Sequence, residues 1–219
     1  MVVLGISKLI VQDESQGISA HLLPIGPGDT VLDLCSAPGG KTIALADKVG
    51  PSGKVISLDK DPKRLENVKE NAERVGLKNI EYIAEDLLKY APGRKFKYIL
   101  LDVPCSGLGT ISANADLRWT KKEKDIKAFA KIQKAMLSKA AELLHDTGFL
   151  VYSTCTTEPD EIENVVADFL KSHGSFYLEN SRNPQISQFR TETGTYHAWP
   201  HKHGIGGGGF ALLRHKNEA

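Results

Sequence analysis

Short apolar segments alternate along this chain with longer segments in which apolar residues recur at helical spacing. Five short segments rich in Val, Ile, Leu or Phe end in polar or small residues, a pattern that predicts buried strands. They are residues 30–34, 54–58, 79–84, 96–101 and 149–152. Two further apolar segments, 175–178 and 209–213, predict strands near the end of the chain.

The longer segments predict helices between these strands. Gly40–Val49 stops at a Gly-Pro-Ser-Gly turn, and Pro62–Val75 has Asp61 as a candidate cap and Gly76 as a stop signal. Residues 123–145 and 158–172 each carry an apolar stripe on one face. Because strands alternate with helices, the sequence predicts an α/β fold with a mainly parallel sheet that helices cover on both faces.

Two cysteines follow two of these predicted strands. Cys105 comes shortly after residues 96–101, with Asp102 between them, and Cys155 follows residues 149–152. In open α/β sheets, ligands bind at the carboxyl ends of the strands, so this pair indicates covalent chemistry on a bound substrate. The alternative is a pair of buried, inert thiols, because a free cysteine often serves as a small core residue.

The first strand-to-helix turn, residues 33–42, is small and glycine-rich, which lets a ligand approach the backbone at a helix N-terminus. It matches neither the GxGxxG pattern nor a P-loop. Asp59 follows the second strand and is placed to accept from a ribose diol, whereas Asp86 follows the third and is placed to meet an adenine amino group. Acids after successive strands would repel a pyrophosphate, so the turn favours S-adenosylmethionine. Alternatively, both acids only cap turns.

Four blocks of the sequence resemble the RsmB/Sun family of RNA 5-methylcytosine methyltransferases. They occur in the family's order and span nearly the whole chain. The blocks are Val11-Gln12-Asp13-Glu14-Ser15-Gln16, Asp33-Leu34-Cys35-Ser36-Ala37-Pro38-Gly39-Gly40-Lys41-Thr42, Asp102-Val103-Pro104-Cys105-Ser106-Gly107 and Tyr152-Ser153-Thr154-Cys155.

This resemblance implies a Rossmann-like methyltransferase fold of seven strands with the last strand reversed, and S-adenosylmethionine as cofactor. It makes Cys155 the nucleophile and Cys105 the cysteine that assists product release. DNA cytosine methyltransferases use the Pro-Cys cysteine as nucleophile, so the Thr154-Cys155 block is what favours the RNA family. The expected cofactor-binding residues are Cys35, Ser36, Ala37, Pro38, Gly39, Gly40, Lys41, Asp59, Lys60, Arg64, Asp86 and Asp102.

The chemistry of cytosine explains the need for two thiols. Addition of the Cys155 thiolate to C6 makes C5 nucleophilic toward a sulfonium methyl group. Lys41 is a candidate source of positive potential for the thiolate. Asp102, protonated or sharing a proton with the base, would bind N3 and the exocyclic amine. Cys105, directly or through water, is the candidate for promoting removal of the C5 proton.

Weaker signals concern the substrate and metals. Pro104, Arg118 and Trp119 are expected to meet the RNA, Arg118 at a phosphate and Trp119 by stacking on a base. A helix-capping loop with a packed Trp119 is the alternative. We expect no metal site, because His197, His201 and His203 have no carboxylate or cysteine at ligand spacing.

Composition limits the remaining choices only loosely. The 28 basic and 27 acidic residues give a net charge of +1, which neither requires nor excludes a nucleic-acid partner. Three cysteines are too few for a disulfide scaffold and lack zinc-site spacing. The sequence shows no membrane span, and its first eight residues do not form a signal peptide, so we expect a cytoplasmic monomer.

The chain departs from the family's usual pattern in two places. Only 11 residues precede the Gln12-Asp13-Glu14 block, so we expect one catalytic domain, residues 1–219, without the upstream RNA-binding domain. Near the end, Gly207-Gly208-Gly209-Phe210 replaces an Asp-Gly-Phe-Phe-like stretch, and the glycine run at 206–209 predicts a flexible loop. Ribosomal RNA is the expected substrate by analogy. A tRNA methyltransferase and a noncatalytic RNA-binding assembly factor are the alternatives.

Overall fold

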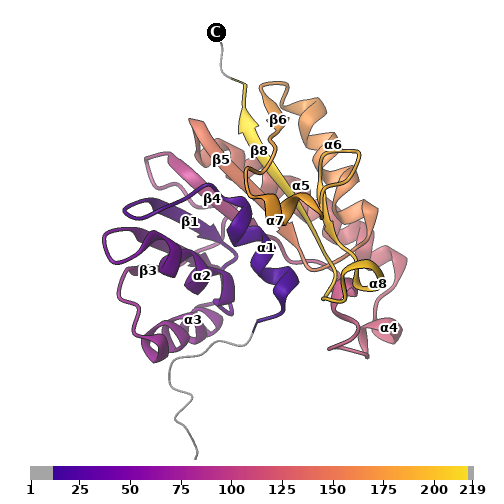
Figure 1. Cartoon of the computed structure of the whole chain (residues 1–219), viewed down its shortest axis with the longest axis horizontal. Helices are drawn as coiled ribbons and strands as arrows, with labels where there is room; N and C mark the ends of the chain where they lie inside the picture. The colour runs from indigo at the N-terminus through magenta and orange to yellow at the C-terminus, as the bar shows by residue number, and fades with distance from the viewer. Residues whose placement is uncertain (1–11, 217–219) are drawn as a thin grey trace, which may run out of the picture.

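A mixed β-sheet of eight strands runs through residues 12–216, the part of the chain that this computed structural model describes (Figure 1). The strands lie in the order β3-β2-β1-β4-β5-β8-β6, and β7 pairs with β8 beside this path. Their bounds are β1 Thr30–Leu34, β2 Lys54–Asp59, β3 Ile80–Ala84, β4 Phe96–Asp102, β5 Leu144–Thr154, β6 Phe176–Leu178, β7 Tyr196–Ala198 and β8 Gly208–His215.

Strand directions match the predicted fold class. Strands β3, β2, β1, β4 and β5 are paired in parallel, whereas β8 runs antiparallel to β5, β6 and β7. The seven predicted strands are all present, and the reversed last strand is confirmed. The eighth strand, β7, is the addition. It is only three residues long and has no extended apolar run, so the sequence did not reveal it.

Helices cover both faces of the sheet (Figure 1). Helices α1, α2 and α7 pack on one face, whereas α5 and α6 pack on the other. Helix α3 lies beside β2 and β3. The helix bounds are α1 Glu14–Leu22, α2 Gly40–Val49, α3 Pro62–Val75, α4 Leu117–Thr120, α5 Glu123–Leu143, α6 Glu163–Ser172, α7 Pro184–Ser187 and α8 Pro200–His203, with 3₁₀ turns η1 Leu108–Thr110 and η2 Pro159–Glu161.

The central strand β4 shows why the sheet needs both layers. Tyr98 and Leu100 face the α1 and α2 layer, whereas Ile99 and Leu101 face the α5 and α6 layer. All four are buried, which is why this strand reads as an unbroken apolar run rather than an alternating one. Each such burial contributes roughly 1.5–3 kcal/mol relative to an exposed side chain.

Two helix predictions require correction, and helix α1 was not predicted. The helix predicted at 158–172 is a 3₁₀ turn followed by α6, because Ile162 lies outside the helical region, at φ −126° and ψ −83°. The helix predicted at 123–145 ends at Leu143, and β5 begins directly after it. Helix α1 was not predicted, since its small and polar residues form only a weak apolar stripe. Asp13 caps it by accepting from the Ser15 N–H at 2.9 Å.

The predicted flexible loop at 206–209 is wrong. All four glycines are buried, and the last two begin β8. A Cβ on Gly209 would collide with the Ile162 side chain, and one on Gly109 would collide with the Gly207 backbone, so close packing rather than mobility explains these glycines. The Gly206 N–H donates to the Asp13 carboxylate at 3.1 Å. Asp13, which caps α1, therefore holds the glycine segment, in which the aspartate of the family's usual pattern is missing.

Two predictions concern residues outside the described range. The absence of a signal peptide rests on Met1 to Lys8, and the first family block begins at Val11. Extending the catalytic domain over residues 1–219 likewise stays a prediction. None of the helices described between residues 12 and 216 combines the length and the hydrophobicity that crossing a bilayer requires.

Candidate active site

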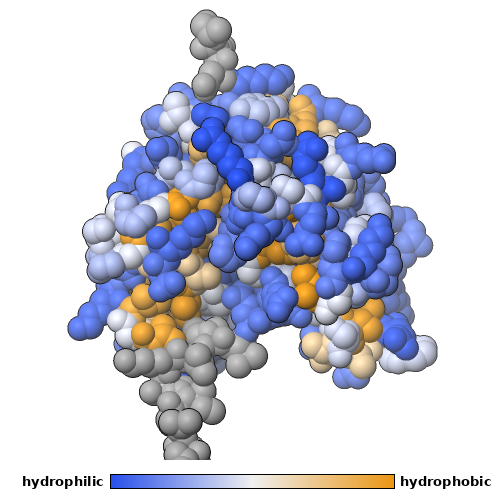
Figure 2. Space-filling model, viewed as in Figure 1, coloured by the Kyte–Doolittle hydropathy of each residue, from blue (hydrophilic) through white to orange (hydrophobic). Residues whose placement is uncertain are grey.

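A cleft of about 960 Å³ opens at the carboxyl ends of β1, β2, β4 and β5. Figure 2 shows an indentation in the lower edge of the molecule, beside the region that carries α4 in Figure 1. The predicted cofactor residues all line this cleft, together with Pro104, Cys105 and Cys155. Its other lining residues are Gln12, Gln16, Leu58, Asn71, Arg74, Leu87, Val103, Thr110, Asn114 and Met136.

The glycine-rich turn between β1 and α2 forms one wall. Gly39 adopts a φ of 107°, and a Cβ there would lie 2.9 Å from the Val68 side chain, so this position requires glycine. Helix α3 fixes the turn from behind. Arg64 donates to the Ala37 carbonyl at 2.7 Å, and Asn71 donates to the Pro38 carbonyl at 3.1 Å. The wall is therefore shaped before any ligand binds.

The acids after β2 and β3 cap turns, as the alternative interpretation predicted, and both also face the cleft. Asp59 accepts from the Ala37 N–H at 3.1 Å and the Asp61 N–H at 3.0 Å. Asp86 accepts from the Leu88 N–H at 3.0 Å. Both therefore cap turns, and both also line the cleft. Three acids along one cleft, Asp59, Asp86 and Asp102, fit a cofactor with a cationic sulfonium and hydroxyl and amino donors, such as S-adenosylmethionine.

Lys41 and Asp102 form an ion pair in the lining of the cleft. The Lys41 ammonium lies 2.7 Å from Asp102 Oδ2 and donates at 2.7 Å to Gln16 Oε1. Asp102 Oδ1 accepts from the Ser153 hydroxyl at 2.9 Å. Both carboxylate oxygens of Asp102 thus accept hydrogen bonds, one from Lys41 and the other from Ser153.

The two cysteines meet beside this ion pair. Cys105 follows β4, Cys155 follows β5, and their sulfur atoms lie 3.0 Å apart. The hydrogen bond from Cys105 lowers the pKa of Cys155, and the Lys41 ammonium acts in the same direction against burial and Asp102. The same contact, together with burial, raises the pKa of Cys105. Cys155 is therefore the thiol that ionises first, as a nucleophile must.

The third cysteine is chemically different. Cys35 lines the cleft, where burial, and then the nearby Asp59, raise its pKa to about 12. A thiol with this pKa is almost entirely protonated at neutral pH. Cys35 therefore shapes the cleft and is not a candidate nucleophile.

Arg118 and Trp119 do not line the cleft. They lie on α4, which follows the Cys105 turn, and 79% of the Trp119 surface is exposed. The packed Trp119 that the alternative interpretation required is therefore absent. An exposed indole next to an exposed arginine is the combination that single-stranded nucleic-acid sites use.

The histidines lie away from this cleft. His197 is buried, and its Nε2 lies 2.6 Å from Glu163 Oε1, a pairing that spacing along the chain did not reveal. Within residues 12–216, no group of three or more His, Cys, Asp or Glu side chains is arranged to hold a metal ion. The pairing of His197 with Glu163 links β7 to α6.

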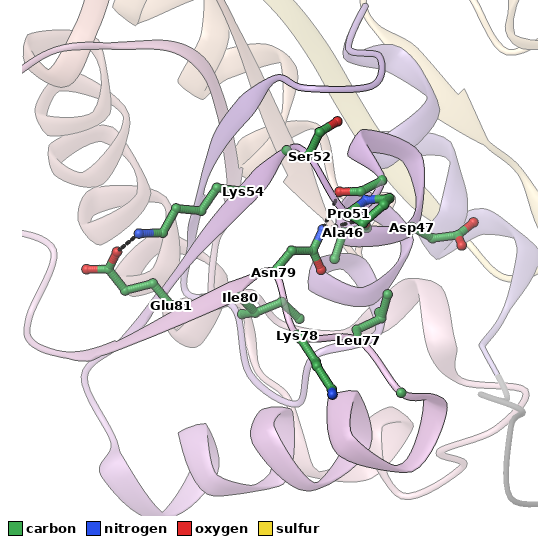
Figure 3. A pocket seen from close by; sticks show the side chains of 13 residues that line it. Ala46, Asp47, Pro51, Ser52, Lys54, Leu77, Lys78, Asn79, Ile80 and Glu81 are labelled. Atoms are coloured by element: carbon green, nitrogen blue, oxygen red, sulfur yellow. Dashed lines mark hydrogen bonds and ion pairs between the residues drawn. The ribbon is translucent and has the colours of Figure 1, made fainter.

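A second hollow lies at the opposite, amino-terminal end of β2 and β3 (Figure 3). Asn79 bridges its floor by donating to the carbonyls of Ala46 and Gly50, and Lys54 pairs with Glu81 at its rim. It contains neither a nucleophile nor a cluster of perturbed groups. Its contacts join α2 to β3 and account for it structurally.

Sequence reasoning missed the contribution of α1 and of Gln12, which precedes it. Gln16 contacts Lys41, and a Cβ on Gly40 would lie 3.1 Å from the Gln12 side chain. Both glutamines belong to the first family block, so the block marked their importance without assigning a role. Met136, Thr110 and Asn114 also line the cleft, and no local pattern distinguishes them from ordinary packing or loop residues.

The chain is similar in sequence to a known family of proteins. Residues 20–214 match the family described as 16S rRNA methyltransferase RsmB/F. The chain belongs to this family. It is 37% identical over 200 residues to the probable ribosomal RNA small subunit methyltransferase B of Synechocystis sp., covering 88% of this chain and 44% of that protein. The corresponding Bacillus subtilis protein is 35% identical over 215 residues, covering 95% and 48% respectively.

Solved structures agree with this RsmB/F assignment. The crystal structure of NSun6 from Pyrococcus horikoshii with SFG matches at a TM-score of 0.84 and 32% identity, over 93% of this chain and 52% of that one. The recognised family, the Rossmann-like fold and S-adenosylmethionine as the cofactor are thereby confirmed. The chain spans less than half the length of these two curated RsmB/F relatives.

Proposed function

We propose that this chain carries the catalytic centre of an S-adenosylmethionine-dependent RNA methyltransferase that acts on cytosine C5, in ribosomal RNA, through a covalent Cys155–C6 intermediate. The observation that supports this most strongly is the 3.0 Å contact between two thiols of opposite pKa shift, beside the Lys41–Asp102 pair. The choice of ribosomal RNA follows the names of the curated relatives.

The first step is activation of the base. The Cys155 thiolate adds to C6, and the electron pair of the C5–C6 double bond moves toward C5 and N3. Asp102, protonated or sharing a proton with the base, binds N3 and the exocyclic amine as charge builds on the ring. When bound, the cofactor supplies a methyl group on a positively charged sulfur. Transfer of this methyl group to the activated C5 would leave the sulfur as a neutral thioether.

The second step is release. The C5 proton must leave, the C5–C6 double bond must re-form, and the C6–sulfur bond must break to return the Cys155 thiolate. Contact with Cys155 is the largest cause of the raised pKa of Cys105. Once Cys155 is bonded to C6, it carries no negative charge, so Cys105 ionises more easily than in the free enzyme. Cys105 is therefore suited to act as the base only after the covalent bond exists.

The target base must be unstacked to reach these thiols, because C6 is attacked from the face of the ring. Trp119 and Arg118 lie on the short helix that follows the Cys105 turn, where an exposed indole can stack on a neighbouring base and a guanidinium can meet a phosphate. These residues thus supply a contact surface for single-stranded RNA outside the cleft.

Transfer of a labelled methyl group from S-adenosylmethionine to unmodified ribosomal RNA and to tRNA, followed by nucleoside analysis, tests this function. We expect label in 5-methylcytosine from ribosomal RNA. Label in tRNA but not in ribosomal RNA would mean that the substrate is tRNA. Cofactor binding without any label, even when the RNA-binding region of a full-length relative is added, would favour the noncatalytic assembly factor.

A further inference from the structure

A buried carboxylate lies directly behind the turn that carries Cys105. Glu161 has no exposed surface, and its Oε2 accepts from the backbone N–H of Ser106 at 2.9 Å. The same oxygen accepts from the side-chain amide of Gln133 at 2.9 Å. Gln133 is equally buried and also donates to the Pro104 carbonyl at 3.0 Å. The residues on both sides of Cys105 are therefore held by one two-residue unit.

The same unit is joined to the strand that carries Cys155. The Tyr152 hydroxyl donates to the Glu161 carbonyl at 2.6 Å, and the Ser106 hydroxyl donates to Thr156 Oγ1 at 3.0 Å. Tyr152 lies at the end of β5, and Thr156 directly follows Cys155. The two thiols, which come from different strands, are thus fixed to a common support on the side away from the cleft.

Burying the Glu161 carboxylate costs free energy that packing alone does not explain. A buried carboxylate loses its hydration, and here only neutral donors contact it, both through one oxygen. Glu161 Oε1 and Gln133 Oε1 have no hydrogen-bond partner among the described residues. Apolar side chains of similar volume usually stabilise a core as well as or better than buried charges. A role in holding the turn accounts for a group that packing alone does not favour.

We propose that Glu161 is a positioning residue for the reaction proposed above: oriented by Gln133, it holds the 104–106 turn so that the Cys105 sulfur stays in contact with the Cys155 sulfur. The charged and titratable groups around Cys105 are Cys155, Glu161, Tyr152 and, beyond Cys155, Asp102 and Lys41. Glu161 also adds to the raised pKa of Cys105, after contact with Cys155 and burial. Its charge therefore favours the protonated form of Cys105.

Capture by phenylarsine oxide tests this placement without RNA or cofactor, because one arsenic atom bridges two thiols only when they lie close together. Peptide mapping then identifies adducts that join Cys105 to Cys155. We expect wild-type protein to be captured rapidly, Glu161→Ala slowly, and Glu161→Gln at close to the wild-type rate, since its amide oxygen still accepts from Ser106. Glu163→Gln is the matched control, because that carboxylate contacts His197 and not the turn.

Methyl-transfer kinetics give the second readout. Displacing Cys105 in Glu161→Ala should lower kcat by on the order of 10²-fold with little change in KM, and covalent RNA adduct should accumulate. Thermal melting verifies folding. If Glu161→Ala does not fold, Gln133→Met, which removes the orienting donor, replaces it and should slow capture.

A folded Glu161→Ala variant with the wild-type capture rate and the wild-type kcat would overturn the positioning role. An equal loss of capture rate in Glu161→Gln and Glu161→Ala would also overturn it. Slow capture in Glu161→Ala combined with no methyl transfer by wild type would overturn the proposed function while leaving Glu161 as the residue that places Cys105.

Discussion

The sulfur atoms of Cys105 and Cys155 lie 3.0 Å apart, although 50 residues separate them in the chain. The sheet register explains the meeting. Asp102, at the end of β4, pairs with Ser153 in β5, so each strand delivers its cysteine just beyond the same edge of the sheet. The Gly109 N–H also donates to the Cys155 carbonyl at 3.0 Å, which holds the segment after Cys105 against the second thiol.

Cys155→Ala removes the proposed nucleophile and should abolish methyl transfer, a loss of at least about 10⁴-fold. Cofactor affinity, measured by calorimetry, should stay close to wild type, because Cys155 is proposed to contact the base and not the cofactor. Residual transfer within tenfold of wild type would contradict the assignment of Cys155 as the nucleophile.

Cys105→Ala should leave the first step possible and slow the release step. We therefore expect an RNA–protein adduct that survives denaturing electrophoresis and depends on cofactor. The double variant with Cys155→Ala is the control, and it should form no adduct. Free methylated RNA produced by Cys105→Ala at the normal rate would show that Cys105 has no part in release.

Thiol alkylation should follow the order of the pKa shifts. Iodoacetamide should modify Cys155 first, because its pKa is lowered, and Cys35 last, because burial raises its pKa to about 12. Mass-spectrometric mapping of the alkylated cysteines at about pH 6 to about pH 9 measures this order. This range brackets the ordinary thiol pKa of about 8.5. Faster labelling of Cys35 than of Cys155 would contradict the electrostatic account of the site.

Lys41→Met should raise the pKa of Cys155, because it removes the ammonium that favours the thiolate. The alkylation profile of Cys155 should move to higher pH, and kcat should fall by about 10²-fold or more. Lys48→Met is the matched control on the same helix, since Lys48 donates to the carbonyls of Ala20 and Leu23 away from the thiols. An unchanged profile in Lys41→Met would separate Lys41 from thiol activation.

Asp33 should make stability depend on pH. Burial raises its pKa from 3.8 to about 7, partly offset by the hydrogen bond from Thr42. Between these values the folded protein binds more protons at this group than the unfolded chain does, so stability falls as pH rises from about 4 to about 7 and then levels off. The full effect is roughly 4 kcal/mol at most.

Asp33→Asn keeps an oxygen that accepts from Thr42 but cannot ionise. The free energy of unfolding, measured in urea at about pH 5 and about pH 7, should therefore decrease less between the two pH values for Asp33→Asn than for wild type. The first pH lies inside the window of roughly 4 to 7 that this group sets, and the second lies at its upper end. The same decrease in both proteins would exclude Asp33 as its source.

The sequence predicted the parallel sheet well because each strand carries its own apolar signal. Residues 96–101 are buried on both faces and appear as an uninterrupted apolar run, and Asp61 and Gly76 bound α3 by local capping chemistry. Helix α1 and strand β7 were missed because tertiary partners, rather than local pattern, stabilise them. Ile162 interrupts a helix that periodicity alone extends through it.

The sequence also indicated the glycine-rich turn that lines the cleft, since its residues are contiguous. The residues that connect distant segments were not. Gln16 reaches Lys41 from 25 residues away, Gln133 reaches Glu161 from 28, and Asp13 reaches Gly206 from 193. Such pairs depend on how α1, α5 and η2 pack around the sheet, and neither spacing nor composition indicates them.

The most direct test of the account is the site of covalent attachment on RNA in which 5-fluorocytosine replaces cytosine. Fluorine at C5 cannot leave as a proton, so the adduct formed after methyl transfer is trapped. Peptide mapping of the trapped protein should find the nucleotide on Cys155. Attachment to Cys105, or no adduct from a protein that binds both cofactor and RNA, would contradict the proposed mechanism.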